Sequence, residues 1–223
     1  MASVFLSFRG RSADAASAKG ETKADVVRVA CVGDSITFGS GVENRAKNNY
    51  PAVLNALLGP GYQVKNFGVS GATLLKKGNK PYWKLVQFRA ADDFAPDIVV
   101  IALGTNDSKP MNWEHKEEFA GDLKEMIEHF RGLRSKSHVM VCLPPPVFQK
   151  DEDGINERTV KEEIIPVIRK IAEASGAGII DLHEALIKHR EFLPDGVHPN
   201  AAGAKIVAET VHAALSKEKK GAR

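Results

Sequence analysis

The sequence contains few of the residues and segments that would assign it to a specialised class of protein. It has two cysteines in 223 residues, Cys31 and Cys142, and each lies inside an apolar stretch rather than beside a histidine. We therefore expect two small buried side chains, not a disulfide framework or a metal site. Two such cysteines do not indicate whether the protein works in a reducing or an oxidising compartment. No apolar stretch approaches the roughly 20 residues that cross a bilayer, so no membrane is expected as a partner.

An excess of one charge is also missing from most of the chain. The formal net charge is +3, but residues 216–223 alone carry four basic side chains and one acidic one. The rest of the chain is close to neutral and offers no basic face for nucleic acid, which is therefore not expected as a partner. The hydrophobic fraction of 43% and the charged fraction of 26% are those of an ordinary soluble globular protein.

The length suits one domain with a sizeable core. We expect it to cover residues 26–215, between a leader of residues 1–25 and a basic tail of residues 216–223. Residues 9–25 are rich in Ala, Ser, Lys and Gly without an apolar period, which favours a disordered leader. Ala16-Ser17-Ala18 resembles a cleavage site, so a degenerate export signal is the alternative, and the protein is either cytoplasmic or exported.

Short apolar runs alternate with helical patterns along the domain. The runs predict strands at about 26–32, 62–67, 98–103, 139–143 and 178–181. Helices are expected at 50–58, at 115–134, in a stretch that ends at 174 with a kink at Pro166, and at 201–215. This alternation indicates an α/β fold with a mostly parallel sheet that is covered on both faces.

Candidate functional residues follow directly on three of these strands. Gly33-Asp34-Ser35 ends the first, Ser70-Gly71 follows the second and Asn106 follows the third. In open parallel sheets, functional residues gather at the carboxyl ends of the strands. Ser35 is thus a candidate nucleophile, although Asp and Ser are also ordinary helix caps. Glycine at position 71 can turn a backbone N–H toward the site, and Asn106 offers a side-chain amide for an oxyanion.

A serine nucleophile needs a base, and seven histidines are available. His198 lies in the segment Asp195-Gly196-Val197-His198, where the glycine allows the carboxylate and the imidazole to face each other. The same residues also read as a simple turn before the last helix. His183, which follows the last strand, is the rival base.

Together these motifs resemble the four sequence blocks of the SGNH (GDSL) hydrolase superfamily. The blocks are Gly33-Asp34-Ser35, Gly68 with Ser70-Gly71, Gly104-Thr105-Asn106-Asp107 and Asp195-Gly196-Val197-His198, in the family's order. The resemblance implies a three-layer flavodoxin-like fold with a five-stranded parallel sheet. It also implies serine esterase chemistry without a cofactor or metal. It assigns Ser35 as nucleophile, His198 as base and Asp195 as its partner, with Ser35, Gly71 and Asn106 as oxyanion donors.

Residues 66–83 resemble the carbohydrate acetylesterases of that superfamily, including sialate O-acetylesterase-like proteins. The expected substrate is therefore a small-molecule or carbohydrate ester with a short acyl group such as acetyl. Tyr82 and Trp83 could stack on a sugar, although at least one is expected to pack the loop instead, and Asp34 is included among the substrate-binding residues. The alternatives are a thioesterase or lysophospholipase of the same fold, a sugar-binding module without turnover, and a phosphate- or flavin-binding protein suggested by Gly39-Ser40-Gly41.

Overall fold

A computed structural model describes residues 26–149 and 154–221 of the chain, with side chains to Lys217. The expected leader, residues 1–25, lies outside the described residues. Five strands form one parallel sheet in the order β2-β1-β3-β4-β5, which is the flavodoxin-like order. Their bounds are β1 Val27–Gly33, β2 Tyr62–Gly68, β3 Ile98–Ala102, β4 His138–Leu143 and β5 Gly178–Asp181. All five lie within two residues of the predicted positions.

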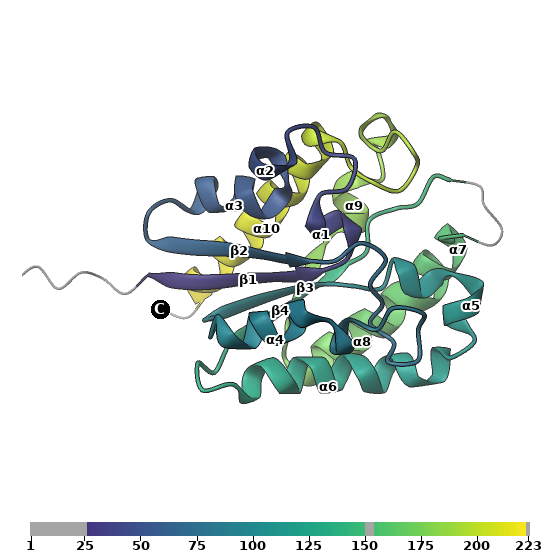
Figure 1. The fold of residues 1–223 in the computed structure, drawn as a ribbon, viewed down its shortest axis with the longest axis horizontal. Helices are drawn as coiled ribbons and strands as arrows, with labels where there is room; N and C mark the ends of the chain where they lie inside the picture. The colour runs from purple at the N-terminus through teal and green to yellow at the C-terminus, as the bar shows by residue number, and fades with distance from the viewer. Residues whose placement is uncertain (1–25, 150–153, 222–223) are drawn as a thin grey trace, which may run out of the picture.

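Helices cover both faces of this sheet, so that the molecule has three layers (Figure 1). One face carries α3 (Tyr50–Leu58), α9 (Leu182–Leu186) and α10 (Ala201–Gly221), and the other carries α4 (Val86–Asp93), α6 (Phe119–Gly132) and α8 (Ile165–Ser175). Short helices lie near the carboxyl ends of the strands: α1 Ser35–Phe38, α2 Arg45–Asn48, α5 Pro110–Trp113 and α7 Glu157–Thr159.

Alternation along the strands divides the core between the two faces. On β1, Val29 and Cys31 pack with α3 and α10, whereas Ala30 and Val32 pack with α4, α6 and α8. This is the period of two that a strand imposes on its side chains. β1, β3 and β4 lie inside the sheet and are covered on both faces. Their residues are therefore mostly apolar, as the sequence indicated.

Several helices differ from the predicted ones for local reasons. The helix expected at 115–134 begins as a 3₁₀ turn, Lys116–Glu118, and continues as α6. Pro166 occupies the first turn of α8, where proline is tolerated because it has no N–H to bond to the preceding turn. Directly before α8, residues Val160–Ile164 form a π-helical turn. α10 continues beyond the predicted end at residue 215 to Gly221, since lysine and glutamate, which predominate there, favour helix. α4 was not predicted, because its apolar residues are few.

In the described residues, the two cysteines form no disulfide, and neither a metal site nor a membrane-spanning helix is found. Cys31 and Cys142 are free and buried, as expected. Residues 26–149 and 154–221 contain no cluster of three or more His, Cys, Asp or Glu side chains that could hold a metal ion. Within the same ranges, no helix combines the length and apolar character of a membrane span.

Candidate active site

Ser35 is placed by a short helix that rests directly on the ends of two strands. β1 ends at Gly33, and Ser35 begins α1 with Asp34 as its N-cap. A Cβ on Gly33 would lie 2.1 Å from Thr37 Oγ1 of α1, and one on Gly68 would lie 2.2 Å from the backbone nitrogen of Phe38. Glycine is thus required at both strand ends for α1 to approach the sheet this closely.

Ser35, His198 and Asp195 form one hydrogen-bonded chain. The His198 ring lies with Nε2 2.8 Å from Ser35 Oγ and Nδ1 2.6 Å from Asp195 Oδ2. Ser35 and His198 are 163 positions apart in the sequence. With Asp195 accepting the Nδ1 proton, Nε2 is free to accept the proton of the serine hydroxyl. The structure therefore brings together the three residues that the sequence singled out.

The loop that carries the histidine also fixes the state of its carboxylate partner. Asp195 Oδ1 accepts hydrogen bonds from the backbone N–H groups of Val197 (2.9 Å) and His198 (2.7 Å). Burial acts to raise the pKa of Asp195, but the bonds from the His198 N–H, the His198 ring and the Val197 N–H outweigh it and hold the pKa below its ordinary value. The carboxylate is therefore ionised at neutral pH and able to orient the imidazole.

Gly196 allows this loop to pack against a second one. Its φ is +83°, and a Cβ there would lie 2.5 Å from the backbone nitrogen of Gln149. The carbonyl oxygen of Gly196 accepts a hydrogen bond from the Phe148 N–H at 2.7 Å. The segment after β4 thus supports the loop between Asp195 and His198.

The candidate oxyanion donors come from the ends of adjacent strands. Gly33 pairs in register with Gly68 on β2 and with Ala102 on β3, so the segments that follow all three begin side by side. Gly71 has a φ of +80°, and Asn106 is 2% exposed. One hydrogen of the Asn106 amide is held by the carbonyl oxygen of Ala72 at 3.2 Å. The second hydrogen remains for another acceptor.

Asp34 lies beneath the site rather than on the surface that a substrate reaches. It is 1% exposed, and its Oδ1 accepts a hydrogen bond from the Ile36 N–H at 2.9 Å. Its side chain lines a cavity of about 10 Å³ together with Thr105 and Pro144. Burial raises its pKa to about 6, against smaller opposing effects of the Ile36 N–H and of His198. This corrects the expectation that Asp34 contacts the substrate.

The buried charge of Asp34 should cost stability. A carboxyl whose pKa rises from its ordinary 3.8 to about 6 costs the folded state about 3 kcal/mol above pH 6 and nothing below pH 3.8. Asp34→Asn keeps an acceptor for the Ile36 N–H, so we expect it to unfold in urea with a free energy about 1–3 kcal/mol higher than the wild type at pH 8. The difference should shrink as the pH falls toward 4, and a difference independent of pH would contradict this account.

Tyr82 and Trp83 belong to the packing of their loop. Tyr82 is fully buried, and its hydroxyl donates to the carbonyl oxygen of Phe67 at 2.7 Å, so it cannot stack on a sugar. Trp83 is partly buried and donates from Nε1 to the carbonyl oxygen of Leu74 at 2.9 Å, while its ring contacts Phe88 and the ammonium of Lys76. Tyr82 therefore packs the loop, as was expected of at least one of the two aromatics, and is not available as the sugar contact that the sequence also suggested. Trp83 is engaged in packing as well. Sequence alone did not separate the two uses of an aromatic loop residue.

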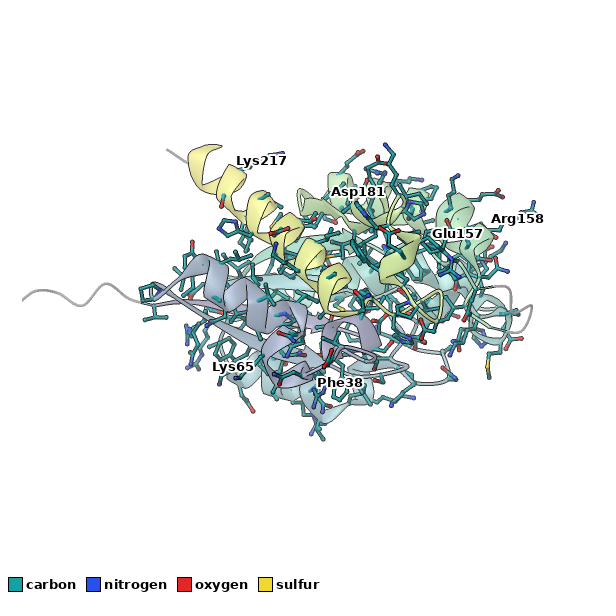
Figure 2. All side chains as sticks on the ribbon, turned by 90° about the horizontal axis from the view of Figure 1, so that it is seen from above. Phe38, Lys65, Glu157, Arg158, Asp181 and Lys217 are labelled. Carbon is teal, nitrogen blue, oxygen red and sulfur yellow. The ribbon has the colours of Figure 1, made fainter. Side chains whose placement is uncertain are left out.

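His183, the rival base, is placed elsewhere. Its Nε2 lies 2.9 Å from Oε1 of Glu157, whose other oxygen accepts a hydrogen bond from the Val147 N–H. Glu157 is the first residue of α7, and Figure 2 shows it toward the right-hand end of the molecule. His183 thus holds the segment after β4 in place.

Several polar residues beside the site were not predicted from the sequence to take part in catalysis. The hydroxyls of Ser40 and Ser70 lie 2.9 Å apart and are exposed, and Lys80 Nζ donates to the carbonyl oxygen of Ser70 at 2.8 Å. Asp107 is fully buried next to Asn106. The signal for Asp107 was its place in the same block as Asn106, and Ser40 was noted only within Gly39-Ser40-Gly41, as a sign of phosphate or flavin binding. Lys80 carried no signal.

A parallel α/β sheet with a Ser–His–Asp chain at its strand ends is the arrangement of many serine hydrolases. The profile of the GDSL-like lipase/acylhydrolase family matches residues 31–206, and the chain belongs to this family. This agrees with the resemblance that the four sequence blocks indicated.

Individual proteins similar to this chain carry more specific names. An acetylxylan esterase of Xylanibacter ruminicola is 43% identical over 211 residues, which is 86% of this chain and 44% of that protein. The chain therefore spans less than half the length of this curated relative.

Solved structures show the same fold. A carbohydrate acetylesterase family member from Sinorhizobium meliloti superposes with a TM-score of 0.69 at 19% identity, covering 86% of this chain and 98% of that one. An aryl esterase of M. smegmatis superposes with a TM-score of 0.67 at 21% identity, covering 86% and 99%.

Proposed function

We propose that this chain is a serine esterase that removes acetyl groups from carbohydrates. The observation that carries the proposal is the hydrogen-bonded chain from Ser35 Oγ through His198 to Asp195, with distances of 2.8 and 2.6 Å. A hydroxyl, an imidazole and a carboxylate in this order are the components that nucleophilic ester hydrolysis requires. The acetylxylan esterase that is 43% identical over 211 aligned residues supports the choice of substrate.

The proposed reaction proceeds in two halves. Ser35 Oγ attacks the ester carbonyl carbon while His198 Nε2 takes the hydroxyl proton. The resulting tetrahedral intermediate breaks down as the imidazolium gives this proton to the departing sugar oxygen, which leaves an acetylated serine. Water, deprotonated by the same imidazole, then attacks the acyl carbon, and acetate leaves as Ser35 regains its proton.

Negative charge on the carbonyl oxygen needs donors that are already in place. The backbone N–H groups of Ser35 and Gly71 and the second amide hydrogen of Asn106 are proposed for this role. All three follow strand ends that lie side by side, at Gly33, Gly68 and Ala102. Removing one such donor typically costs about 10²- to 10³-fold in kcat.

Two cavities bear on the length of the acyl group. A cavity of about 690 Å³ lies between β5 and α10 and is lined by none of the proposed catalytic residues. A second cavity, beside Asp34, holds only about 10 Å³. Neither of these two cavities would give a long acyl chain a channel at Ser35. The exposed hydroxyls of Ser40 and Ser70 are proposed contacts for the sugar, in place of Tyr82.

An acyl-chain and acceptor panel tests this function. We expect acetate release from acetylated xylan, and hydrolysis of p-nitrophenyl acetate with a kcat/KM at least tenfold above that for the octanoate, because the site gives extra methylenes nothing to bury against. Preference for chains of eight carbons, or for acetyl thioesters over the sugar esters, would favour a lysophospholipase or a thioesterase instead. Binding of xylan without turnover would indicate a sugar-binding module.

A further inference from the structure

The two oxyanion donors that follow β2 and β3 belong to segments joined by a buried carboxylate. Asp107 is fully buried, and each of its oxygens accepts one backbone hydrogen bond. Oδ2 accepts from the Leu74 N–H at 3.0 Å and Oδ1 from the Leu75 N–H at 2.7 Å. Asp107 follows Asn106, and Leu74 lies three residues after Gly71. One side chain thus connects the segment of one donor to that of the other.

Further hydrogen bonds orient Asn106 within this connection. Its side-chain nitrogen Nδ2 donates to the carbonyl oxygen of Ala72 at 3.2 Å, and its backbone carbonyl oxygen accepts from Asn112 Nδ2 at 2.7 Å. Asn112 Oδ1 accepts from the Asn79 N–H at 2.8 Å, which joins the far end of the same loop. The loop after β2 and the segment after β3 therefore share a buried polar network centred on residues 106–107.

We propose that Asp107 is a positioning residue that holds the Gly71 N–H and the Asn106 amide in register for the oxyanion, by accepting hydrogen bonds from two consecutive N–H groups of the loop after β2. The inference rests on the proposed esterase function. It adds a residue that does not touch the substrate and acts through the donors that do.

A carboxylate is suited to this role and an amide is not. An ionised carboxylate has acceptor sites on both oxygens, so it can bind two adjacent N–H groups at once. An asparagine has one oxygen and would direct its NH₂ at the other N–H, which leaves a buried donor unsatisfied. Burial raises the pKa of Asp107 to about 7, with the two loop N–H groups acting in the other direction and Asp34 adding to the rise. The ionised carboxylate is therefore costly to bury, so replacing it with a neutral side chain is not expected to prevent folding.

The test measures kcat and KM of Asp107→Asn on p-nitrophenyl acetate, per mole of active site counted by burst titration. We expect kcat to fall by about 10- to 100-fold with KM within twofold, since a misplaced donor weakens binding of the transition state and not of the ester. Asp107→Ala, which removes both acceptor oxygens without adding a donor, should give the same pattern. Asp122→Asn is the matched control, because Asp122 Oδ2 accepts the Lys76 N–H of the same loop at 2.8 Å without adjoining Asn106. Its kcat should stay within twofold of the wild type.

A double-mutant cycle separates positioning from a general loss of stability. Asn106→Ala should lower kcat by about 10²- to 10³-fold in the wild type but by less than about tenfold in Asp107→Asn, because the donor is already misplaced there. Equal losses in both backgrounds, or a wild-type kcat in Asp107→Asn, would overturn the inference. Failure of the proposed function has a different signature, namely a wild type without esterase activity or a Ser35→Ala variant that keeps it.

Discussion

Replacing Ser35 with alanine is expected to lower kcat for p-nitrophenyl acetate by about 10⁴- to 10⁶-fold. The variant loses the atom that forms the acyl-enzyme, while His198, Asp195 and the oxyanion donors remain in place. What survives is the slower attack of water that the remaining site can promote. The measurement is steady-state hydrolysis together with labelling by a fluorophosphonate probe, which should disappear in the variant.

Ser40→Ala is the matched control for this substitution. Ser40 lies five residues further along the same turn, and its exposed hydroxyl bonds to that of Ser70 rather than to the imidazole. Fluorophosphonate labelling should be retained in Ser40→Ala. Labelling that persists in Ser35→Ala, or that vanishes in Ser40→Ala, would place the nucleophile elsewhere.

His198→Ala is expected to produce a loss of similar size, about 10⁴- to 10⁶-fold in kcat. Without the imidazole, nothing accepts the proton of Ser35 as its oxygen attacks, and nothing returns a proton to the leaving alkoxide. Because serine and histidine act as a unit, the double variant Ser35→Ala/His198→Ala should be no slower than either single variant by more than a few fold. Fully additive losses would contradict a shared mechanism.

His183→Ala is the control that addresses the rival base. His183 pairs with Glu157 at 2.9 Å and supports the segment after β4. We expect its removal to lower thermal stability while kcat stays within about threefold. A loss comparable to that of His198→Ala would reverse the assignment of the base.

Most of the sheet could be predicted from the sequence because its strands are buried on both faces. Runs such as Ile98–Ala102 are continuously apolar and bounded by glycine or proline, which is a strong local signal. The grouping of Ser35, Gly71 and Asn106 then followed from topology, since parallel strands bring their carboxyl ends to one edge. No local sequence pattern predicts that Ser35 contacts His198. The resemblance to the four sequence blocks of the family indicated this contact.

The remaining details depended on tertiary contacts that the sequence does not display. The burial of Tyr82 depends on a carbonyl group at Phe67, fifteen residues away, and an aromatic in a polar loop gives no sign of such a partner. Asp34 was included among the substrate-binding residues, yet it caps α1 and its side chain is buried. The sequence predicted a kink at Pro166, but hydrophobic periodicity does not reveal that the residues before it form a π-helical turn.

The two glycines under α1 have a consequence for motion within the site. Because Gly33 and Gly68 allow α1 to pack directly on the paired strands, we expect Ser35 to move together with the sheet. His198 travels instead with the loop around Gly196, whose neighbour is the segment at Phe148 and Gln149. The loop around Gly196, and not α1, is therefore the part of the site through which the separation between nucleophile and base can change.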